Sequence, residues 1–200
     1  MAIVPPVKVG EPRVLVEPKW GKGMIEQDFR FPDGSIKTFN LWHSPGARTS
    51  IMFPLTRDGD VIILRQWRPA AAYLEPEHGI ITELPGGNPE RGTNPSHEEV
   101  AETELREETG YHAREWLPLL PQMAWWEPAN FTPRYMPVLG IGCEKVQEPE
   151  PDETELIEVQ VIPLREWVGM ISRGEIRDAK SLAVTFLALL RLGLLELKLP

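Results

Sequence analysis

The amino-acid sequence predicts an α/β (α+β) fold in which helices flank a mixed sheet, with a region of antiparallel strands at the N-terminus. Three observations predict this fold class: strand-like segments fill the first half of the chain, one clearly bounded helix follows them, and two more helices come after the last strand. With this order of elements, the helices can cover the sheet and so bury the apolar faces of both. A chain of 200 residues suffices for one medium-sized domain, or one domain with a small appended sheet.

Turn residues place two hairpins in the first half of the chain. Pro32-Asp33-Gly34 separates strand-like segments 24–31 and 35–42, and Arg57-Asp58-Gly59-Asp60 separates 50–55 from 61–67. The apolar runs of the second pair are typical of strands covered on both sides. After these come expected strands at 116–120, 135–141 and 156–162 and helices at 164–171 and 180–191, while residues 1–18 are expected to form an extended arm.

The helix in the middle of the chain has recognisable ends. Ser96 is placed to cap its first turn, and Glu99, three residues later, completes a capping box. Asn94-Pro95 disfavours an upstream extension, and Gly110 suits the left-handed position that follows a helix. We therefore expect one helix between Ser96 and Gly110.

This helix carries three glutamates at helical spacing. At about 100° per residue, Glu104, Glu107 and Glu108 project from one face, while Arg106 points to the opposite side. Like charges at this spacing repel one another, and Val100 on the same arc indicates that the face packs against protein. Oxygen ligands without cysteine or histidine suit a hard divalent cation, Mg²⁺ or Mn²⁺. The alternative is a solvated acidic surface.

The residues around this helix resemble the signature of the Nudix hydrolases, Gx5Ex7REUxEExGU, in which U is a bulky aliphatic or aromatic residue. Gly87 matches the first glycine, and the second half is matched by Glu104-Leu105, Glu107-Glu108 and Gly110-Tyr111. The preceding segment, Glu83-Leu84-Pro85-Gly86-Gly87, resembles the family's strand and loop. The resemblance implies a Nudix-type α/β/α sandwich and a metal ion held by Glu104, Glu107 and Glu108, with the Gly86 carbonyl as a further ligand.

Two departures from the signature concern this same site. The stretch between Gly87 and Thr103 is two residues longer than the family spacing, and Thr93 stands where the first glutamate is expected. Thr103 replaces the family's arginine and cannot make the several fixed hydrogen bonds of a guanidinium to neighbouring carboxylates. We therefore expect a site that is less rigid than the family's, or altered.

From about Trp20 to about Leu190 the chain resembles the ADP-ribose pyrophosphatase branch of this family. Residues 61–69 look like the branch's strand that ends in an arginine before a proline, which implies that Arg68 meets the diphosphate of the substrate. The alternative is that Arg65 and Arg68 are ordinary surface charges at the end of a strand.

Residues 151–159 look like the acidic loop and strand from which this branch supplies a catalytic glutamate. Glu155 aligns best with that residue, and Glu153 is second. A carboxylate on such a loop can take a proton from an attacking water near bound metal ions. Composition alone instead favours a solvated loop broken by prolines.

The branch also forms homodimers in which N-terminal strands reach the partner's site. The resemblance therefore implies that residues 1–48 are an arm and strand region that forms the dimer, and that residues 49–200 are the Nudix hydrolase domain. By their positions around the first hairpin, Trp20 and Trp42 resemble the aromatic residues that stack on the adenine. A structural role is the alternative for both tryptophans.

The amino-acid composition indicates which kinds of binding partner and which cellular compartment to expect. With 30 acidic and 21 basic residues the net charge is −9, which opposes nucleic-acid binding, whereas a few arginines and metal ions can still hold a small diphosphate. The single cysteine, Cys143, permits no internal disulfide and suits a reducing cytoplasm. No apolar run is long enough to span a bilayer, so no membrane partner is expected.

These expectations define a metal-dependent hydrolase of a nucleoside diphosphate linked to another moiety, with ADP-ribose giving AMP and ribose 5-phosphate. Two alternatives stay open. Another nucleoside diphosphate sugar could be the substrate, because no motif fixes the base and sugar pockets. The missing glutamate and arginine could instead mark a module that binds a nucleotide without hydrolysing it.

Overall fold

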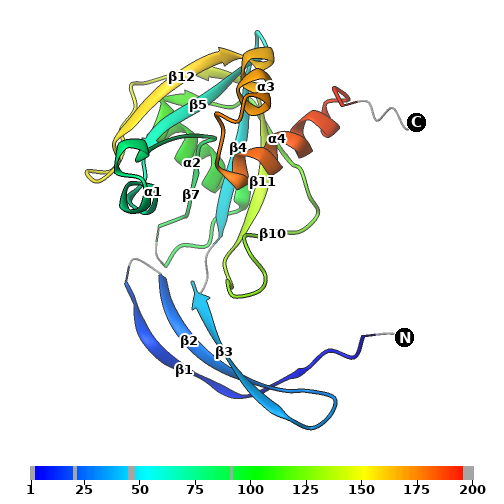
Figure 1. Cartoon of the computed structure of the whole chain (residues 1–200). Coiled ribbons are helices and arrows are strands. Elements are labelled where there is room, and N and C mark those ends of the chain that lie inside the picture. The colour runs from blue at the N-terminus through cyan, green and yellow to red at the C-terminus, as the bar shows by residue number, and fades with distance from the viewer. Residues whose placement is uncertain (1–2, 20–21, 45–47, 91, 196–200) are drawn as a thin grey trace. The chain divides into compact units, whose positions relative to one another are not determined.

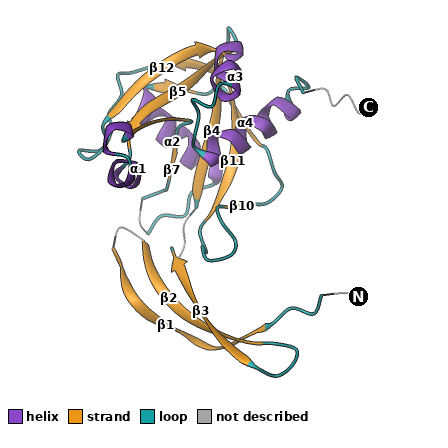
Figure 2. Ribbon diagram, viewed as in Figure 1, coloured by secondary structure: helices purple, strands orange, loops and turns teal. Residues whose placement is uncertain are grey.

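The computed structural model describes residues 3–19, 22–44, 48–90 and 92–195 and divides the chain into two compact units. The first unit comprises Met1–Ala47 and Trp125–Tyr135, and the second comprises Arg48–Ala124 and Met136–Pro200. Figure 1 traces the elements along the chain and Figure 2 separates helices from strands. Each unit is described by itself.

The first unit contains an antiparallel sheet in the order β1-β2-β3, made of β1 (Val7–Lys19), β2 (Lys22–Arg30) and β3 (Ile36–His43). The first expected hairpin is confirmed, since β2 and β3 pair along their whole length around a turn in which Asp33 accepts two hydrogen bonds from Ser35. The expected extended arm is wrong for most of its length, because β1 pairs with β2 and therefore uses its backbone in the sheet.

The second sheet follows the path β10-β11-β4-β5-β12, with four short strands paired at its sides. Its strands are β4 (Thr49–Thr56), β5 (Asp60–Trp67), β6 (Ile80–Glu83), β7 (Gly86–Gly87), β8 (Tyr111–His112), β9 (Glu115–Pro118), β10 (Ala124–Trp125), β11 (Arg134–Lys145) and β12 (Ile157–Pro163). The second expected hairpin and the three later strands are confirmed within a few residues. The fold is the expected combination of a mixed sheet with helices.

The helices are α1 (Pro69–Leu74), a 3-10 turn η1 (Pro76–His78), α2 (His97–Thr109), α3 (Leu164–Ser172) and α4 (Ala179–Arg191). The capping box of α2 is present, with Ser96 and Glu99 bonded reciprocally, and Gly110 has the left-handed φ of 76°. The short helix α1, which the sequence analysis did not predict, begins at the proline that follows β5. No helix in the described ranges is both long and apolar enough to cross a membrane.

The core of the second unit holds α2 against the sheet. Met52 of β4 and Ile62 of β5 pack with Ala101 and Leu105 on the apolar face of α2, and all four side chains are inaccessible to solvent. Because β4 also contacts α4, and its residues from Thr49 to Leu55 are all buried, this strand is covered on both faces. The glutamate-bearing helix therefore has a fixed position on the sheet.

A buried hydrogen bond joins α3 to α4. The indole of Trp167 is fully buried, and its Nε1 donates to Thr185 Oγ1 at 2.9 Å. Burying a polar N–H without a partner costs free energy, so this bond fixes the relative positions of the two helices as well as filling the core.

Replacing Thr185 by Val should destabilise the protein while preserving side-chain shape. The substitution leaves the Trp167 N–H buried without its acceptor, which costs about 1–3 kcal/mol of the free energy of unfolding. Urea denaturation followed by tryptophan fluorescence measures this loss. The exposed Thr154→Val is the control and should change stability by less than about 0.5 kcal/mol; equal effects of the two substitutions would contradict the assigned role.

Candidate active site

The candidate site begins where the loop after β6 meets α2. Gly86 donates its backbone N–H to Glu108 Oε2 at 3.0 Å. A Cβ at Gly87 would lie 2.2 Å from Glu104 Oε2, which no side chain tolerates without displacing the carboxylate. Gly87 therefore allows the backbone to lie directly against Glu104, while a Cβ at Gly86 would instead lie 2.5 Å from the Ser50 carbonyl oxygen of β4.

The three glutamates of α2 that are expected to hold a metal ion differ in burial. Glu108 is 3% exposed, Glu104 is partly buried, and Glu107 is exposed. The expectation that all three lie on one packed face is therefore wrong for Glu107. The difference arises because β7, which carries Gly86 and Gly87, covers the positions of Glu104 and Glu108.

Burial makes a negative charge unfavourable at the two covered glutamates. It raises the pKa of Glu104 to about 8, and the negative charges of Glu107, Glu155 and Asp152 act in the same direction. Burial also raises the pKa of Glu108 well above its ordinary value, with a further contribution from the charge of Glu104. Both carboxylates are thus poised to bind either protons or a cation.

Glu107 has a milder environment. Partial burial raises its pKa, the nearby Arg106 guanidinium lowers it, and the charges of Asp152, Glu90 and Glu155 raise it again. The expectation that Arg106 cannot offset the glutamates is therefore wrong for Glu107, since Arg106 is its sequence neighbour and long enough to act at its exposed carboxylate.

The acidic loop before β12 is held against the C-terminal end of α2. Val146 and Gln147 donate their backbone N–H groups to the Gly110 carbonyl, and Glu150 donates its own to the Glu107 carbonyl at 2.7 Å. A Cβ at Gly110 would lie 2.2 Å from the Gln147 carbonyl oxygen. Gly110 therefore serves both to end the helix and to admit this loop.

Docking of the loop brings Glu155 close to the helix glutamates. Glu155 is partly buried, its carboxylate accepts from the Asp152 backbone N–H at 3.2 Å, and its charge raises the pKa values of the three helix glutamates. Glu153, the other expected base, is exposed. The geometry thus brings Glu155 to the site, and the role of either glutamate stays a prediction.

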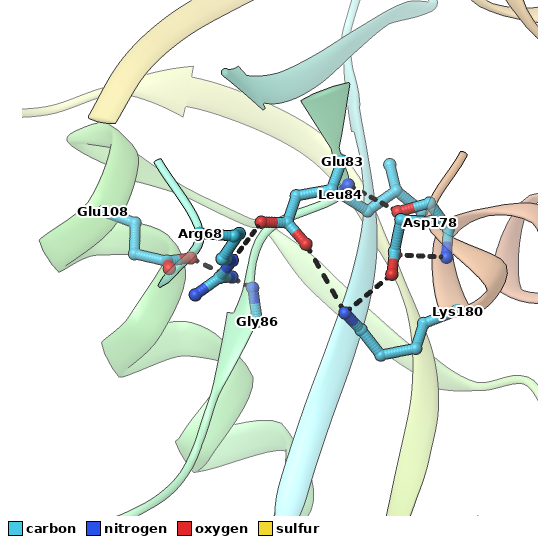
Figure 3. A network of polar contacts seen from close by, with 8 residues as sticks. Arg68, Glu83, Leu84, Gly86, Glu108, Asp178 and Lys180 are labelled. Carbon is cyan, nitrogen blue, oxygen red and sulfur yellow. Dashed lines mark hydrogen bonds and ion pairs between the residues drawn. The ribbon is translucent and has the colours of Figure 1, made fainter. Parts of the chain in front are cut away.

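Arg68 lies at the same site, directly after β5. Its Nε donates to Glu83 Oε1 at 2.6 Å, and its positive charge lowers the pKa of Glu108 against the effect of burial. Figure 3 shows the Arg68 side chain between the carboxylates of Glu83 and Glu108. Arg65 instead forms an exposed ion pair with Glu158 at 2.8 Å. Arg65 is therefore an ordinary surface charge, whereas Arg68 pairs with a buried carboxylate.

Two tryptophans are expected to stack on a base. Trp20 lies outside the described residues, and Trp42 belongs to the first unit. Trp42 is 43% exposed, and its ring meets the edge of Phe131 with centroids 6.4 Å apart. Its backbone also bonds to Asn130 and Thr132, so the position of the ring is set by segment 130–132, and stacking on adenine stays a prediction.

Sequence reasoning missed several charged residues that the fold brings to the site. Asp152 and Glu90 act on the pKa values of the helix glutamates, and Glu83 and Lys180 form an ion pair close to Arg68. Glu83 stands in the quoted lead-in segment, but no spacing rule links it to Arg68 or Lys180. The two threonines at the altered positions of the signature, Thr93 and Thr103, are exposed.

The donors present fit a hard divalent cation. Within the described ranges, no group of three His, Cys, Asp or Glu side chains is arranged to hold a metal ion. Glu104 and Glu108 nevertheless offer carboxylate oxygens whose buried charge is unfavourable unless a positive charge offsets it. The chemistry of this pair therefore fits such an ion, while Glu107 does not share its burial.

Comparison with known proteins shows that the chain is a hydrolase and gives its family. The sequence model of the NUDIX domain matches residues 46–184, so the chain belongs to the Nudix family. Enzymes of this family generally use divalent metal ions.

The chain is similar to one curated protein and to one solved structure. It is 30% identical over 157 residues to an ADP-ribose pyrophosphatase of Bacillus subtilis (strain 168), covering 78% of each chain. A crystal structure of an ADP compounds hydrolase matches with a TM-score of 0.78 at 17% identity, covering 96% of this chain and 97% of that one, which shows a shared fold. The expected Nudix hydrolase of the ADP-ribose pyrophosphatase-like branch is confirmed, which speaks against the non-hydrolytic alternative.

Replacing Glu104 by Gln should make the metal-free protein more stable at alkaline pH. The pKa of Glu104 rises from 4.5 to about 8 on folding, so the folded state binds more protons than the unfolded state between these values. The stability associated with protonated Glu104 is full below pH 4.5 and is lost as the pH rises through 8. The stabilisation by Gln should therefore grow as the pH rises between these two values and reach on the order of 4 kcal/mol near pH 8.5.

Urea denaturation in EDTA at pH 5 and at pH 8.5 measures this difference. Glu107→Gln is the comparison on the same helix and should show a smaller pH-dependent change than Glu104→Gln, because Glu107 is exposed while Glu104 is partly buried. A Glu104→Gln effect of equal size at the two pH values would contradict the assigned pKa.

Proposed function

We propose that this chain hydrolyses the diphosphate of ADP-ribose to AMP and ribose 5-phosphate in the presence of Mg²⁺ or Mn²⁺. The observation that carries the proposal is the buried pair Glu104 and Glu108, whose negative charge needs a cation, next to an arginine fixed by a hydrogen bond. The similarity to an ADP-ribose pyrophosphatase of Bacillus subtilis supports the choice of substrate.

The cation would be held by Glu104 and Glu108, with Glu107 and the Gly86 carbonyl as further ligands. When bound, it supplies positive charge that offsets these carboxylates and the diphosphate and makes phosphorus easier to attack. Protonated glutamates do not bind metal ions well, so their raised pKa values predict that loading improves as the pH rises.

Arg68 and the acidic loop would act on the substrate and on water. Arg68 keeps its terminal guanidinium nitrogens available for diphosphate oxygens, since the bond to Glu83 uses Nε. A water oxygen forms the new bond to phosphorus, and the bond from phosphorus to the bridging oxygen breaks. Glu155, or Glu153 as the alternative, accepts the proton of that water.

The remaining expectations extend this proposal beyond the chemical step. Residues 1–48 would form a homodimer, residues 49–200 would form the hydrolase domain, and Trp42 and Trp20 would stack on the adenine. Cytoplasmic location belongs to the same proposal. An exposed indole such as Trp42 offers a flat apolar face suited to stacking on a base.

A hydrolysis screen tests the proposal directly. ADP-ribose is incubated beside other nucleoside diphosphate sugars with Mg²⁺, with Mn²⁺ or with EDTA, and products are separated by ion-exchange chromatography. We expect AMP and ribose 5-phosphate from ADP-ribose and no turnover in EDTA. A clear preference for another nucleoside diphosphate sugar would replace the proposed substrate with the alternative that the sequence leaves open.

Replacing Glu108 by Gln should abolish turnover without unfolding the protein. The amide keeps an oxygen that can accept from the Gly86 N–H but loses the charge that a cation needs. Activity should fall by a factor of about 10³ or more, while the circular dichroism spectrum stays unchanged. Glu98→Gln, on the first turn of the same helix, is the control; full activity of Glu108→Gln would remove this residue from the mechanism.

A matched pair of loop variants distinguishes the two expected bases. Glu155→Gln should lower kcat by a factor of about 10²–10⁴, because a carboxylate that accepts the proton is lost, whereas the exposed Glu153→Gln should change kcat little. The reverse ranking of the two variants would assign the role to Glu153.

A further inference from the structure

Glu83 is a buried carboxylate that binds cations from two segments far apart in the sequence. It is the last residue of β6, and its side chain is 3% exposed. Oε1 accepts from Arg68 Nε at 2.6 Å, and Oε2 faces Lys180 Nζ at 3.4 Å. A carboxylate this deeply buried is held in one position, since both oxygens are bound and water has almost no access.

The far side of Glu83 is fixed by the first turn of α4. Lys180 Nζ also binds Asp178 Oδ1 at 2.9 Å, and Asp178 caps the helix by accepting from the Ser181 N–H. Ser181 Oγ in turn accepts from the backbone N–H of Leu84, the residue after Glu83, at 2.8 Å. The start of α4 thus holds both the backbone next to Glu83 and the cation opposite its carboxylate (Figure 3).

Charges alternate along this network, from Arg68 through Glu83 and Lys180 to Asp178. Burial would raise the pKa of Asp178, but the Lys180 ammonium and the bonds from Ser181 lower it, so Asp178 carries its charge. Lys180 therefore has an anion on either side. Because Glu83 is shared between two cations, Arg68 keeps part of its positive charge available for a further anion.

The bond to Glu83 restricts how Arg68 can move. Arg68 stands between β5 and α1 with its side chain 38% exposed, a degree of exposure at which an arginine ordinarily samples several rotamers. In the described contacts Arg68 binds Glu83 through Nε alone, so the two terminal nitrogens, whose fork geometry suits phosphate oxygens, make no bond to Glu83. The Arg68 side chain has thus already lost conformational entropy before a ligand binds, so binding loses less.

We propose that Glu83, itself fixed by Lys180 and the cap of α4, is the positioning residue that holds Arg68 ready for the diphosphate. This inference rests on the proposed function of Arg68, and Glu83 acts only through that arginine. A merely structural ion pair between β6 and α4 would use the same contacts but would stabilise the fold without any specific link to ligand binding.

A double-mutant cycle separates these roles. In Glu83→Gln we expect KM for ADP-ribose to rise about tenfold with kcat nearly unchanged, as is typical for loss of binding shared by ground state and transition state. In an Arg68→Ala background the same change should leave KM unaltered. Glu158→Gln is the matched control, because it weakens the neighbouring exposed Arg65 pair and should not change KM.

A second measurement does not depend on activity. In ¹⁵N spectra the Nε–H of Arg68 should exchange with solvent more slowly than that of Arg65 in the unaltered protein, because only Arg68 donates Nε to a buried carboxylate in the described contacts. Glu83→Gln should accelerate this exchange by about tenfold, and Glu158→Gln should not. The comparison of Arg68 with Arg65 needs no variant, so it applies even if Glu83→Gln fails to fold.

Two results would overturn the proposal: a rise in KM that persists in the Arg68→Ala background, or an Arg68 Nε–H that exchanges as fast as that of Arg65. Failure of the proposed function has a different signature. In that case the unaltered protein does not hydrolyse ADP-ribose, while the exchange measurement still reports whether Glu83 holds Arg68.

Discussion

The burial of the Glu108 carboxylate between α2 and the Gly86 loop constrains the whole site. A charged carboxylate removed from water is unfavourable, and the pKa of Glu108 is therefore raised. The Gly86 N–H and the nearby Arg68 partly stabilise its negative charge. In the proposed function a divalent cation also stabilises this charge. Of the charged groups that act on this buried acid, Arg68 stabilises its negative charge, whereas Glu104 and Glu155 make that charge less favourable.

The sheet places these groups through elements that are distant in sequence. Met52 and Ile62 hold α2, the end of β5 presents Arg68, and the end of β6 presents Glu83. The C-terminal end of α2 then receives the acidic loop, because Gly110 has no side chain to exclude it. The rigid core thus fixes the positions, and loops carry most of the chemistry.

Burial distinguishes residues that look equivalent in the sequence. Arg65 and Arg68 end the same strand, but Arg65 pairs with an exposed glutamate, where an ion pair contributes little, and Arg68 pairs with a buried one. Glu153 and Glu155 differ in the same way. Glu104, Glu107 and Glu108 share one helix, yet only two of them are covered by the loop. In each case residues of the same type lie close together in the sequence but have different tertiary environments.

Most of the elements follow from the amino-acid sequence alone, because caps, turns and the spacing of apolar residues act over a few positions. Ser96, Glu99 and Gly110 bound the helix, and the turn at Asp33 forms the first hairpin, as their local chemistry requires. Other features can be seen only in the tertiary structure. Glu107 is exposed, and Glu155 acts on the glutamates of the helix. Glu83 and Lys180 lie beside Arg68. These depend on packing between segments up to a hundred residues apart, and no local pattern encodes the burial and charge that such packing creates.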